Sequence, residues 1–564
     1  MHVNERRSGP LDPAASTEAG GPSGQRPRPA GLRDQRRVER RLWAAAAWIG
    51  GSVALFAVLL RISLSSPMNS DGANNALQAW DMLHGHLLLP GWIIGDASVY
   101  TFELPLYAII EFFFGLTGVI FHIGAALTYL IVVAFSVALA AANSHGPAVA
   151  ARCAVVVGVL AAPIVTQQGV SILLAAPDHI GTSVFLLGSF LLIERAPARR
   201  FTPPLLAVIL CAGQIGDATV LYVAVPAILL VSAYRILAAR KIRTGDAAIA
   251  VAAAASVPLA SLTRAVMLHF GGYAQVRPRT AISPIGQWPG HLVLAWRAIR
   301  TLYGAFGATV VHAHAPLSGV AAGFGLACLL AAAFGFAKVA GTWRSASRGE
   351  QLLCVAIVVN LAAYAASTLP STYSSREIAS VLPCGAVLAA RACVPSRIAG
   401  VRRARAGLAA AALVALLPLA AAATLPPVRP AAVPLAAWLE AHGFTYGIAG
   451  YWDASSVTLQ SGNRVQVRAV DRYADPIAGF YINAGYWETK FGWYDASRHD
   501  ATFVIANGHQ IGAKTLRAAQ VERYFGRPAA TYRVAGREIL IYRTNLLEQL
   551  GRPSSLRRRA TASG

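Results

Sequence analysis

The chain has 564 residues, of which 55% are hydrophobic and only 13% are charged, and its mean hydropathy is +0.50. This composition excludes an ordinary soluble globular protein. Repeated apolar runs that could cross the ~30 Å hydrocarbon layer predict a polytopic α-helical membrane protein. The net charge of +23 does not indicate a nucleic-acid partner, because arginine collects in short segments between the apolar runs, as the positive-inside rule describes.

Residues 1–41 are rich in Pro, Gly, Ser and Arg and lack apolar periodicity, which predicts a disordered tail. Arginines lie immediately before the first apolar run, at 42–64, so this tail is expected to be cytoplasmic. The protein is expected in the plasma membrane. The next stretch, 65–118, is therefore expected to be an extracytoplasmic loop. Its first part, Ser65–Tyr107, has no Lys or Arg but carries four carboxylates: Asp71, Asp81, Asp96 and Glu103.

The later apolar runs predict further crossings, with arginine clusters at their cytoplasmic ends. The run Pro203–Leu237 is long enough for two crossings that turn outside at Gly216–Asp217. Phe102–Thr117 is short and carries two glutamates. An even number of crossings is needed between the first outer loop and Asp178, so this segment is expected to lie along the interface or to re-enter the membrane. Residues 42–424 are therefore expected to form about eleven transmembrane helices. The remaining predicted spans are 119–142, 147–168, 178–194, 246–268, 316–340, 351–368, 379–394 and 406–424.

An odd number of crossings places residues 425–564 outside, together with the loop 65–118. This C-terminal region begins with helix-like AAWLEAHG and continues with strand-like runs, which predicts one small α/β domain. The strand-like runs are YGIAGYW, SSVTLQSG, RVQVRAV, ATFVIANG, ATYRVAG and REILIYRT. Aromatic pairs such as Tyr451–Trp452 and Tyr486–Trp487 are typical of a domain core, with sugar-stacking surfaces as the alternative.

The order of features from the first span onward resembles the membrane glycosyltransferases of GT-C fold. These features are one span, an outer loop with an early acidic residue, an ALQAWDMLHGH helix, and a Leu-Pro-Leu-Tyr helix ending in FFFGL. The resemblance is to protein mannosyltransferase and aminoarabinose transferase-like groups and covers roughly residues 42–400. It implies a polyprenyl-phosphate sugar donor and an extracytoplasmic glycan, lipid or protein acceptor. In this family the early acidic residue acts as general base or positions the acceptor hydroxyl, and that position is Asp71.

Two positions depart from the family pattern. Gly72 stands where many relatives have a second carboxylate, so the resemblance carries over no paired-acid metal site. Glu103 stands where the aminoarabinose transferases have a lysine that helps to hold phosphate. We therefore expect the phosphate contact from Arg376, at the outer mouth of a late span, or from Arg264. A guanidinium binds phosphate through two hydrogen bonds, and an arginine at that depth is costly unless it is paired or lines a wet cavity.

Further polar residues at the outer ends of spans are candidates for orienting the substrate: Asp178, His179, Asp217 and Glu103. The alternative for Asp178 is capping of the helix that follows Pro177, and for Asp71 it is the N-cap of an interfacial helix. His84 and His86 are two residues apart, which points them to different faces of a helix. We therefore predict no metal ligands, although a divalent metal would be compatible with the chemistry.

The favoured interpretation is a membrane glycosyltransferase. The alternatives are a transporter or flippase of a lipid-linked or small substrate, and a non-catalytic scaffold that binds cell-wall polymer. A transporter would favour internal repeats and ionisable residues near the membrane midplane, whereas here the acids cluster at the outer ends of the spans.

Overall fold

A computed structural model describes most of the chain and divides it into two units, residues 1–54 and 55–564. The residues outside the description are 1–29, 175–178, 198, 241–243, 277–279, 306–314, 373, 396–418, 477–478, 509–513 and 552–564. Helix α1 (Ala30–Leu64) begins at Ala30 rather than at residue 42. The prediction of disorder is therefore wrong for residues 30–41, whose Arg, Gln and Glu residues have good helix propensity.

Seven helices of the described residues are long and apolar enough to cross a membrane. They are α1, α4 (Val119–Ala141), α5 (Pro147–Ile164), α9 (Thr219–Ala238), α10 (Thr244–His269), α12 (Ala315–Gly341) and α13 (Arg348–Ala366). Three further predicted crossings are shorter helices: α7 (Thr182–Arg195), α8 (Thr202–Gly216) and α14 (Val381–Cys393). The predicted span at 406–424 lies mostly outside the described residues, so the number eleven stays a prediction.

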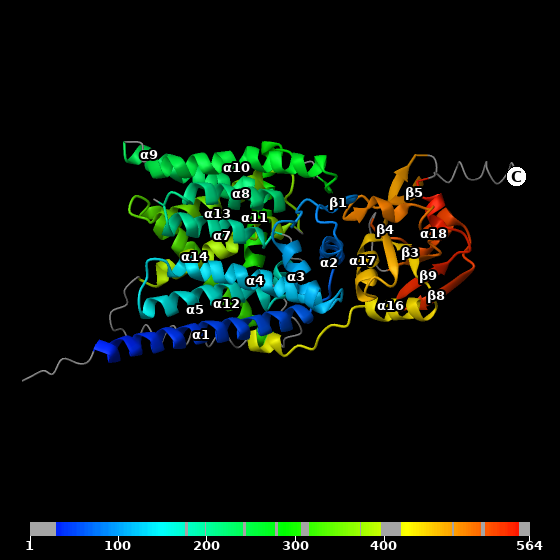
Figure 1. Cartoon of the computed structure of the whole chain (residues 1–564), viewed down its shortest axis with the longest axis horizontal. Coiled ribbons are helices and arrows are strands. Elements are labelled where there is room, and N and C mark those ends of the chain that lie inside the picture. The colour runs from blue at the N-terminus through cyan, green and yellow to red at the C-terminus, as the bar shows by residue number, and fades with distance from the viewer. Residues whose placement is uncertain are drawn as a thin grey trace, which may run out of the picture. The chain divides into compact units, whose positions relative to one another are not determined.

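The bundle helices pack side by side around a continuous apolar core (Figure 1). Helix α14 is buried along almost its whole length between α4, α5, α12 and α13, which explains how a 13-residue helix is held at the centre. The run Pro203–Leu237 does divide into two helices at the predicted turn, because α8 ends at Gly216 and α9 begins at Thr219.

The loop 65–118 is folded rather than irregular. It contains α2 (Ser70–Leu83), β1 (Trp92–Ile94) and α3 (Glu103–Phe114), which pack with the start of α4 around their own apolar cluster. Helix α2 is capped by Asn69, whose side chain accepts a hydrogen bond from Gly72 N at 2.9 Å. The alternative that Asp71 is the N-cap is therefore wrong, since Asp71 lies one position inside the helix.

The C-terminal region is an α/β domain, as predicted. Its six-stranded sheet has the order β5-β4-β3-β7-β9-β8, and β3 pairs in parallel with both of its neighbours. The strands are β3 (Tyr446–Ala449), β4 (Gln466–Asp475), β5 (Gly479–Ala484), β7 (Phe503–Ala506), β8 (Ala530–Val534) and β9 (Arg537–Ile541). The helices are α16 (Ala432–Ala441), α17 (Tyr451–Gln460) and α18 (Ala518–Phe525).

One of the predicted strands is wrong. The run SSVTLQSG, residues 455–462, lies mainly in helix α17, although Val457 and Thr458 favour strands. Helix α17 packs between β4 and α2, and its buried residues run continuously from Ala454 to Leu459. Burial between two partners outweighs the local propensity here.

A second, three-stranded sheet attaches this domain to two segments that connect the helices of the membrane domain. Strand β1 pairs in parallel with β2 (Ala274–Gln275) and antiparallel with β6 (Thr489–Lys490). Beside it, Asp81 accepts hydrogen bonds from Lys490 Nζ and Trp92 Nε1, each at 2.8 Å, and Trp92 packs edge-on against Trp493. Residues far apart in the sequence are therefore held together at this sheet.

Candidate functional site

A cavity of about 350 Å³ lies where several segments that connect the bundle helices meet. Six segments contribute to its polar wall. They are the second residue after β1, the turn before α7, the end of α8, the last third of α10, strand β2 and the short helix η2 (Ser375–Ile378). The polar side chains that line it include Asp96, His179, Asp217, Arg264, Gln275 and Glu377.

Asp217 organises the inner part of this wall. It follows the last residue of α8 in an extended conformation, and its Oδ1 accepts a hydrogen bond from Thr219 N at 2.8 Å, at the start of α9. Its Oδ2 accepts from the Thr182 hydroxyl and lies 2.9 Å from His179 Nδ1. One buried carboxylate therefore ties the turn between α8 and α9 to the start of α7.

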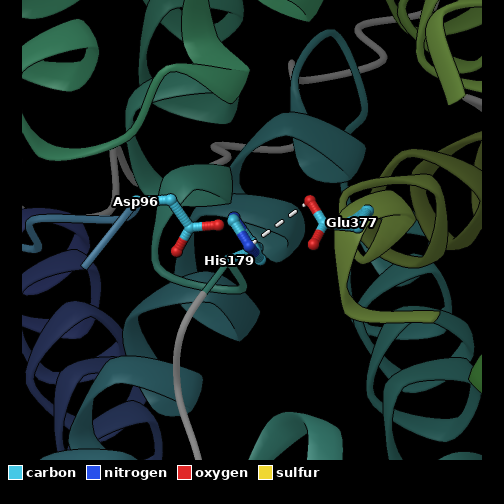
Figure 2. A group of neighbouring side chains, drawn as sticks. All are labelled: Asp96, His179 and Glu377. Carbon is cyan, nitrogen blue, oxygen red and sulfur yellow. Dashed lines mark ion pairs between the residues drawn. The ribbon is translucent and has the colours of Figure 1, made fainter. Parts of the chain in front are cut away.

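His179 lies between two carboxylates. Its Nδ1 lies 2.9 Å from Asp217 Oδ2, and its Nε2 lies 3.4 Å from Glu377 Oε2. The dashed line in Figure 2 marks the ion pair between His179 and Glu377. Burial alone would lower the pKa of His179, but the negative charges of Glu377 and Asp217 outweigh it and hold this pKa well above its ordinary value. Burial also opposes ionisation of the two carboxyls, yet the imidazolium holds the pKa of Asp217 and of Glu377 below the ordinary range.

Asp96 reaches the same place from the first outer loop. Ala97 forms an isolated antiparallel bridge with Asp217, and the Ser98 hydroxyl donates to Ile215 O at 2.7 Å. Gln275 Nε2 of β2 donates to Asp96 O at 2.6 Å. These contacts position the Asp96 carboxylate opposite His179 and Glu377 (Figure 2).

The ligand atoms of Asp96, His179 and Glu377 lie within 4.8 Å of one another. Two carboxylates and one imidazole are a donor set suited to a divalent transition-metal ion. Asp217 at Nδ1 would fix the tautomer that leaves Nε2 for the metal, as outer carboxylates do in many histidine sites. These residues could therefore hold a divalent cation, which would compete with a proton for His179.

Two arginines near the cavity differ in their placement. Arg264 lines it, and its Nη1 donates to Gln214 O at 3.0 Å, at the end of α8. Arg376 is 40% exposed, and its Nε lies 3.8 Å from the carboxylate of its neighbour Glu377. Arg264 is thus a cation in the cavity wall, whereas Arg376 lies beside that wall.

An apolar cavity of about 320 Å³ adjoins the polar one. The two share Thr219, Tyr222, Thr280, Leu369 and Glu377 in their linings. The apolar cavity lies against α9 and α13. The polar cavity is therefore continuous with an apolar cavity that lies against two membrane-spanning helices.

Asp71 lies in a separate polar cluster, at the contact between α2 and α17. Its Oδ1 accepts a hydrogen bond from the hydroxyl of Tyr451, which also lies 2.6 Å from Glu488 Oε2. Asp71 does not line the polar cavity, but the cluster is close to it. A Cβ atom built on Gly95, the residue before Asp96, would lie 3.1 Å from Glu488 Oε1.

The structure brings together several of the residues predicted from the sequence. His179 and Asp217 are hydrogen-bonded, Arg264 lines the same cavity, and Glu103 packs against Gly181, beside His179. Asp178 lies outside the described residues. Tyr451 is fully buried, whereas Trp452 and Tyr486 are 40% and 50% exposed, so the aromatic pairs divide between core and surface.

Sequence reasoning did not select Asp96, Glu377, Tyr451 or Glu488. Asp96 was visible as one of the four loop carboxylates and Glu377 as the neighbour of Arg376. Nothing in the sequence indicated that Tyr451 and Glu488 are partners of Asp71, which lies 380 positions before Tyr451 and still further before Glu488.

No protein-family model matches the sequence, and a search of curated proteins found no match. Among solved structures, the chain is similar to ArnT from Cupriavidus metallidurans in the apo state. The TM-score is 0.52 at 13% identity, and the match covers 90% of this chain and 100% of that one. For ArnT bound to undecaprenyl phosphate the TM-score is 0.50, with the same identity and coverage.

The chain has a GT-C fold. This confirms the predicted fold class, a polytopic membrane domain followed by an α/β domain. An archaeal oligosaccharyltransferase from Archaeoglobus fulgidus, tethered with an acceptor peptide, is also similar over 82% of this chain and 70% of that one. Its TM-score is 0.44 at 11% identity. At these identities the likeness concerns the fold alone.

Proposed function

We propose that the protein is a membrane glycosyltransferase that moves a sugar from a polyprenyl-phosphate donor to an extracytoplasmic acceptor. The observation that carries the proposal is the paired cavity, in which carboxylates, a histidine and an arginine adjoin an apolar space. A lipid-linked sugar phosphate has this same division into a polar head and an apolar tail. The N-terminus would be cytoplasmic, with the cavity and the C-terminal domain outside.

The donor would place its phosphate near Arg264 and its prenyl chain in the apolar cavity. Arg264 supports this role because it lines the polar cavity, and a guanidinium suits phosphate. Arg376 would add positive charge from beside the cavity. ArnT has been crystallised with undecaprenyl phosphate, and the shared fold supports a lipid phosphate of this class here.

In the reaction, the acceptor hydroxyl attacks the anomeric carbon of the donor. The new glycosidic C–O bond forms as the bond to the phosphate oxygen breaks, and its electron pair leaves with the polyprenyl phosphate. The hydroxyl proton passes to a carboxylate base, and a single base suits direct displacement with inversion. We assign this base to Asp71, with Asp96 as the alternative because it lines the polar cavity.

His179, Asp217 and Glu377, with Glu103 behind them, would orient the sugar phosphate. A divalent cation held by Asp96, His179 and Glu377 would supply positive charge for the leaving phosphate. Without such a cation, the raised pKa of His179 keeps an imidazolium at the same position, which is also a positive charge.

The test is to incubate the purified protein in lipid nanodiscs with a panel of polyprenyl-phosphate sugars and to measure released polyprenyl phosphate. We expect release from at least one donor when an acceptor glycan, lipid or peptide is present. Asp71→Asn and Asp96→Asn, run in parallel, identify the base. The matched control is Asp453→Asn, a carboxylate inside the C-terminal domain. The proposal would be overturned if donors bind but neither the wild type nor the control variant releases polyprenyl phosphate from any of them.

A further inference from the structure

Tyr451 connects two carboxylates that belong to different parts of the fold. Its hydroxyl is hydrogen-bonded to Asp71 Oδ1, on α2 of the first outer loop, and lies 2.6 Å from Glu488 Oε2, in the C-terminal domain. Tyr451 is 1% exposed and Glu488 is 7% exposed, whereas Asp71 is only partly buried. The three groups form a chain that runs from a buried end to a more solvated end.

The orientation of Glu488 is fixed from a second side. Ser455 Oγ donates to Asn74 Oδ1 at 2.6 Å, which turns the amide nitrogen of Asn74 toward Glu488 Oε2, at 3.0 Å. Asn74 and Ser455 are both buried. The carboxylate of Glu488 is therefore held in place beside the phenol rather than being free to rotate away.

A count of hydrogen-bond donors shows how many protons the three side chains of Asp71, Tyr451 and Glu488 must share. A tyrosine hydroxyl has one proton and can donate it to only one of two carboxylates. If Asp71 and Glu488 were both ionised, one of the two short contacts would join two acceptors at a buried position, which is strongly unfavourable. One additional proton makes both contacts good hydrogen bonds.

We propose that Asp71 and Glu488 share one proton through Tyr451 and carry a single negative charge between them. Glu488 and Tyr451 are then positioning residues for the base Asp71, and the C-terminal domain sets the protonation of the active site. The shared charge favours the Asp71 end, because that end is better solvated. The shared proton does not depend on the proposed function. Only the statement that Glu488 and Tyr451 position a catalytic base rests on it.

Other charged groups face the chain from the elements packed against it. Lys514 Nζ lies 4.3 Å from the ring centre of Tyr451 and 4.7 Å from that of Trp487. Asp471 of β4 interacts with Lys514, and Asp96 follows Gly95, which touches Glu488. One lysine near these two carboxylates and the shared pair leaves the surroundings negative, which further favours retention of the shared proton.

The first experiment does not depend on enzymatic activity. Infrared difference spectra at neutral pH compare the wild type with Glu488→Gln and with Tyr451→Phe, both close in shape to the native residues. We expect a carbonyl band of a protonated carboxylic acid in the wild type that is lost in both variants. The controls, Glu440→Gln and Tyr473→Phe, alter an exposed ion pair and a backbone contact in the same domain and should keep the band. A wild-type spectrum in which neither variant removes such a band overturns the proposal.

The second experiment measures kcat/KM against pH. Tyr451→Phe removes the donor that stabilises the charge on Asp71, so the acidic limb should move up by about one to two pH units. Glu488→Gln keeps a donor for the phenol oxygen, so the acidic limb of the pH profile should move less in this variant. An acidic limb that stays in place in Tyr451→Phe contradicts the role as a positioning residue. If no donor is turned over by the wild type, the proposed function fails, and the infrared result still decides whether the proton is shared.

Discussion

Asp81→Asn should loosen the attachment of the C-terminal domain to the first outer loop. The Asp81 carboxylate lies 2.8 Å from each of three nitrogens, on Lys490, Trp92 and His86, and Asp81 and Lys490 are 18% and 23% exposed. Hydrogen bonds to charged groups contribute ~1.5–3 kcal/mol each, and Asn keeps one accepting oxygen but removes the charge opposite Lys490. We expect a loss of about 2 kcal/mol in the free energy of local opening, and therefore roughly 30-fold faster amide exchange.

The measurement is hydrogen–deuterium exchange by mass spectrometry, on peptides that contain β1 and β6. The matched control is Asp453→Asn, whose carboxylate is bound by Arg537 and Asn507 inside the C-terminal domain at similar burial. Its β1 and β6 amides should exchange at the wild-type rate. If the β1 and β6 amides exchange at the same rate in Asp81→Asn as in Asp453→Asn, the reasoning is refuted.

The same ion pair gives a pH dependence with a definite sign. Burial would raise the pKa of Asp81, but Lys490 and Trp92 outweigh it, so the folded-state pKa lies below the ordinary value of 3.8. A lowered pKa gives stabilisation that is present above the unfolded value and is lost as pH falls through the folded one. The difference between Asp81→Asn and wild type should therefore be constant near neutral pH and shrink only below about 3.8.

Three further predictions concern the proposed active site. Asp71→Asn should lower kcat by roughly 10²–10⁴-fold while leaving expression near normal, and wild-type turnover would remove Asp71 as the base. Arg264→Ala should raise the apparent KM for the lipid donor more than Arg376→Ala, since only Arg264 lines the polar cavity, and equal KM values would contradict this assignment. Gly181→Ala should lower the melting temperature, because its Cβ would lie 1.5 Å from Glu103 Oε1, and overpacking of this kind costs about 1–3 kcal/mol. An unchanged melting temperature would show that Glu103 moves aside freely.

Much of the membrane architecture could be predicted because it depends on local properties. Apolar length and arginine position identify a span, and two glycines before Asp217 indicated the division between α8 and α9. The same local reasoning failed for SSVTLQSG, where burial between α2 and β4 favours a helix. It also failed at Asn69, since the sequence offers three consecutive good capping residues, Asn69, Ser70 and Asp71, and only the backbone shows which one caps.

Part of the candidate site could also be predicted from local sequence properties. His179, Asp217 and Arg264 stand out because ionisable side chains within predicted membrane spans are rare. Asp96 and Glu377 do not stand out, because each lies in a polar outer segment among other polar residues. What brings them together is the bridge between Ala97 and Asp217 and the position of η2, and neither follows from spacing in the sequence.

The end of β1 connects the two acid clusters of the molecule. Asp96 faces the polar cavity with His179 and Glu377, while its neighbour Gly95 lies against Glu488, the partner of Tyr451 and hence of Asp71. Any side chain at residue 95 would begin 3.1 Å from both Glu488 and Trp487, so only glycine lets the strand end pass between the clusters without displacing them. The C-terminal domain pairs with this same strand through β6. Loosening that pairing should therefore disturb Asp71, the proposed base, and the polar cavity together, which a separate binding module could not do.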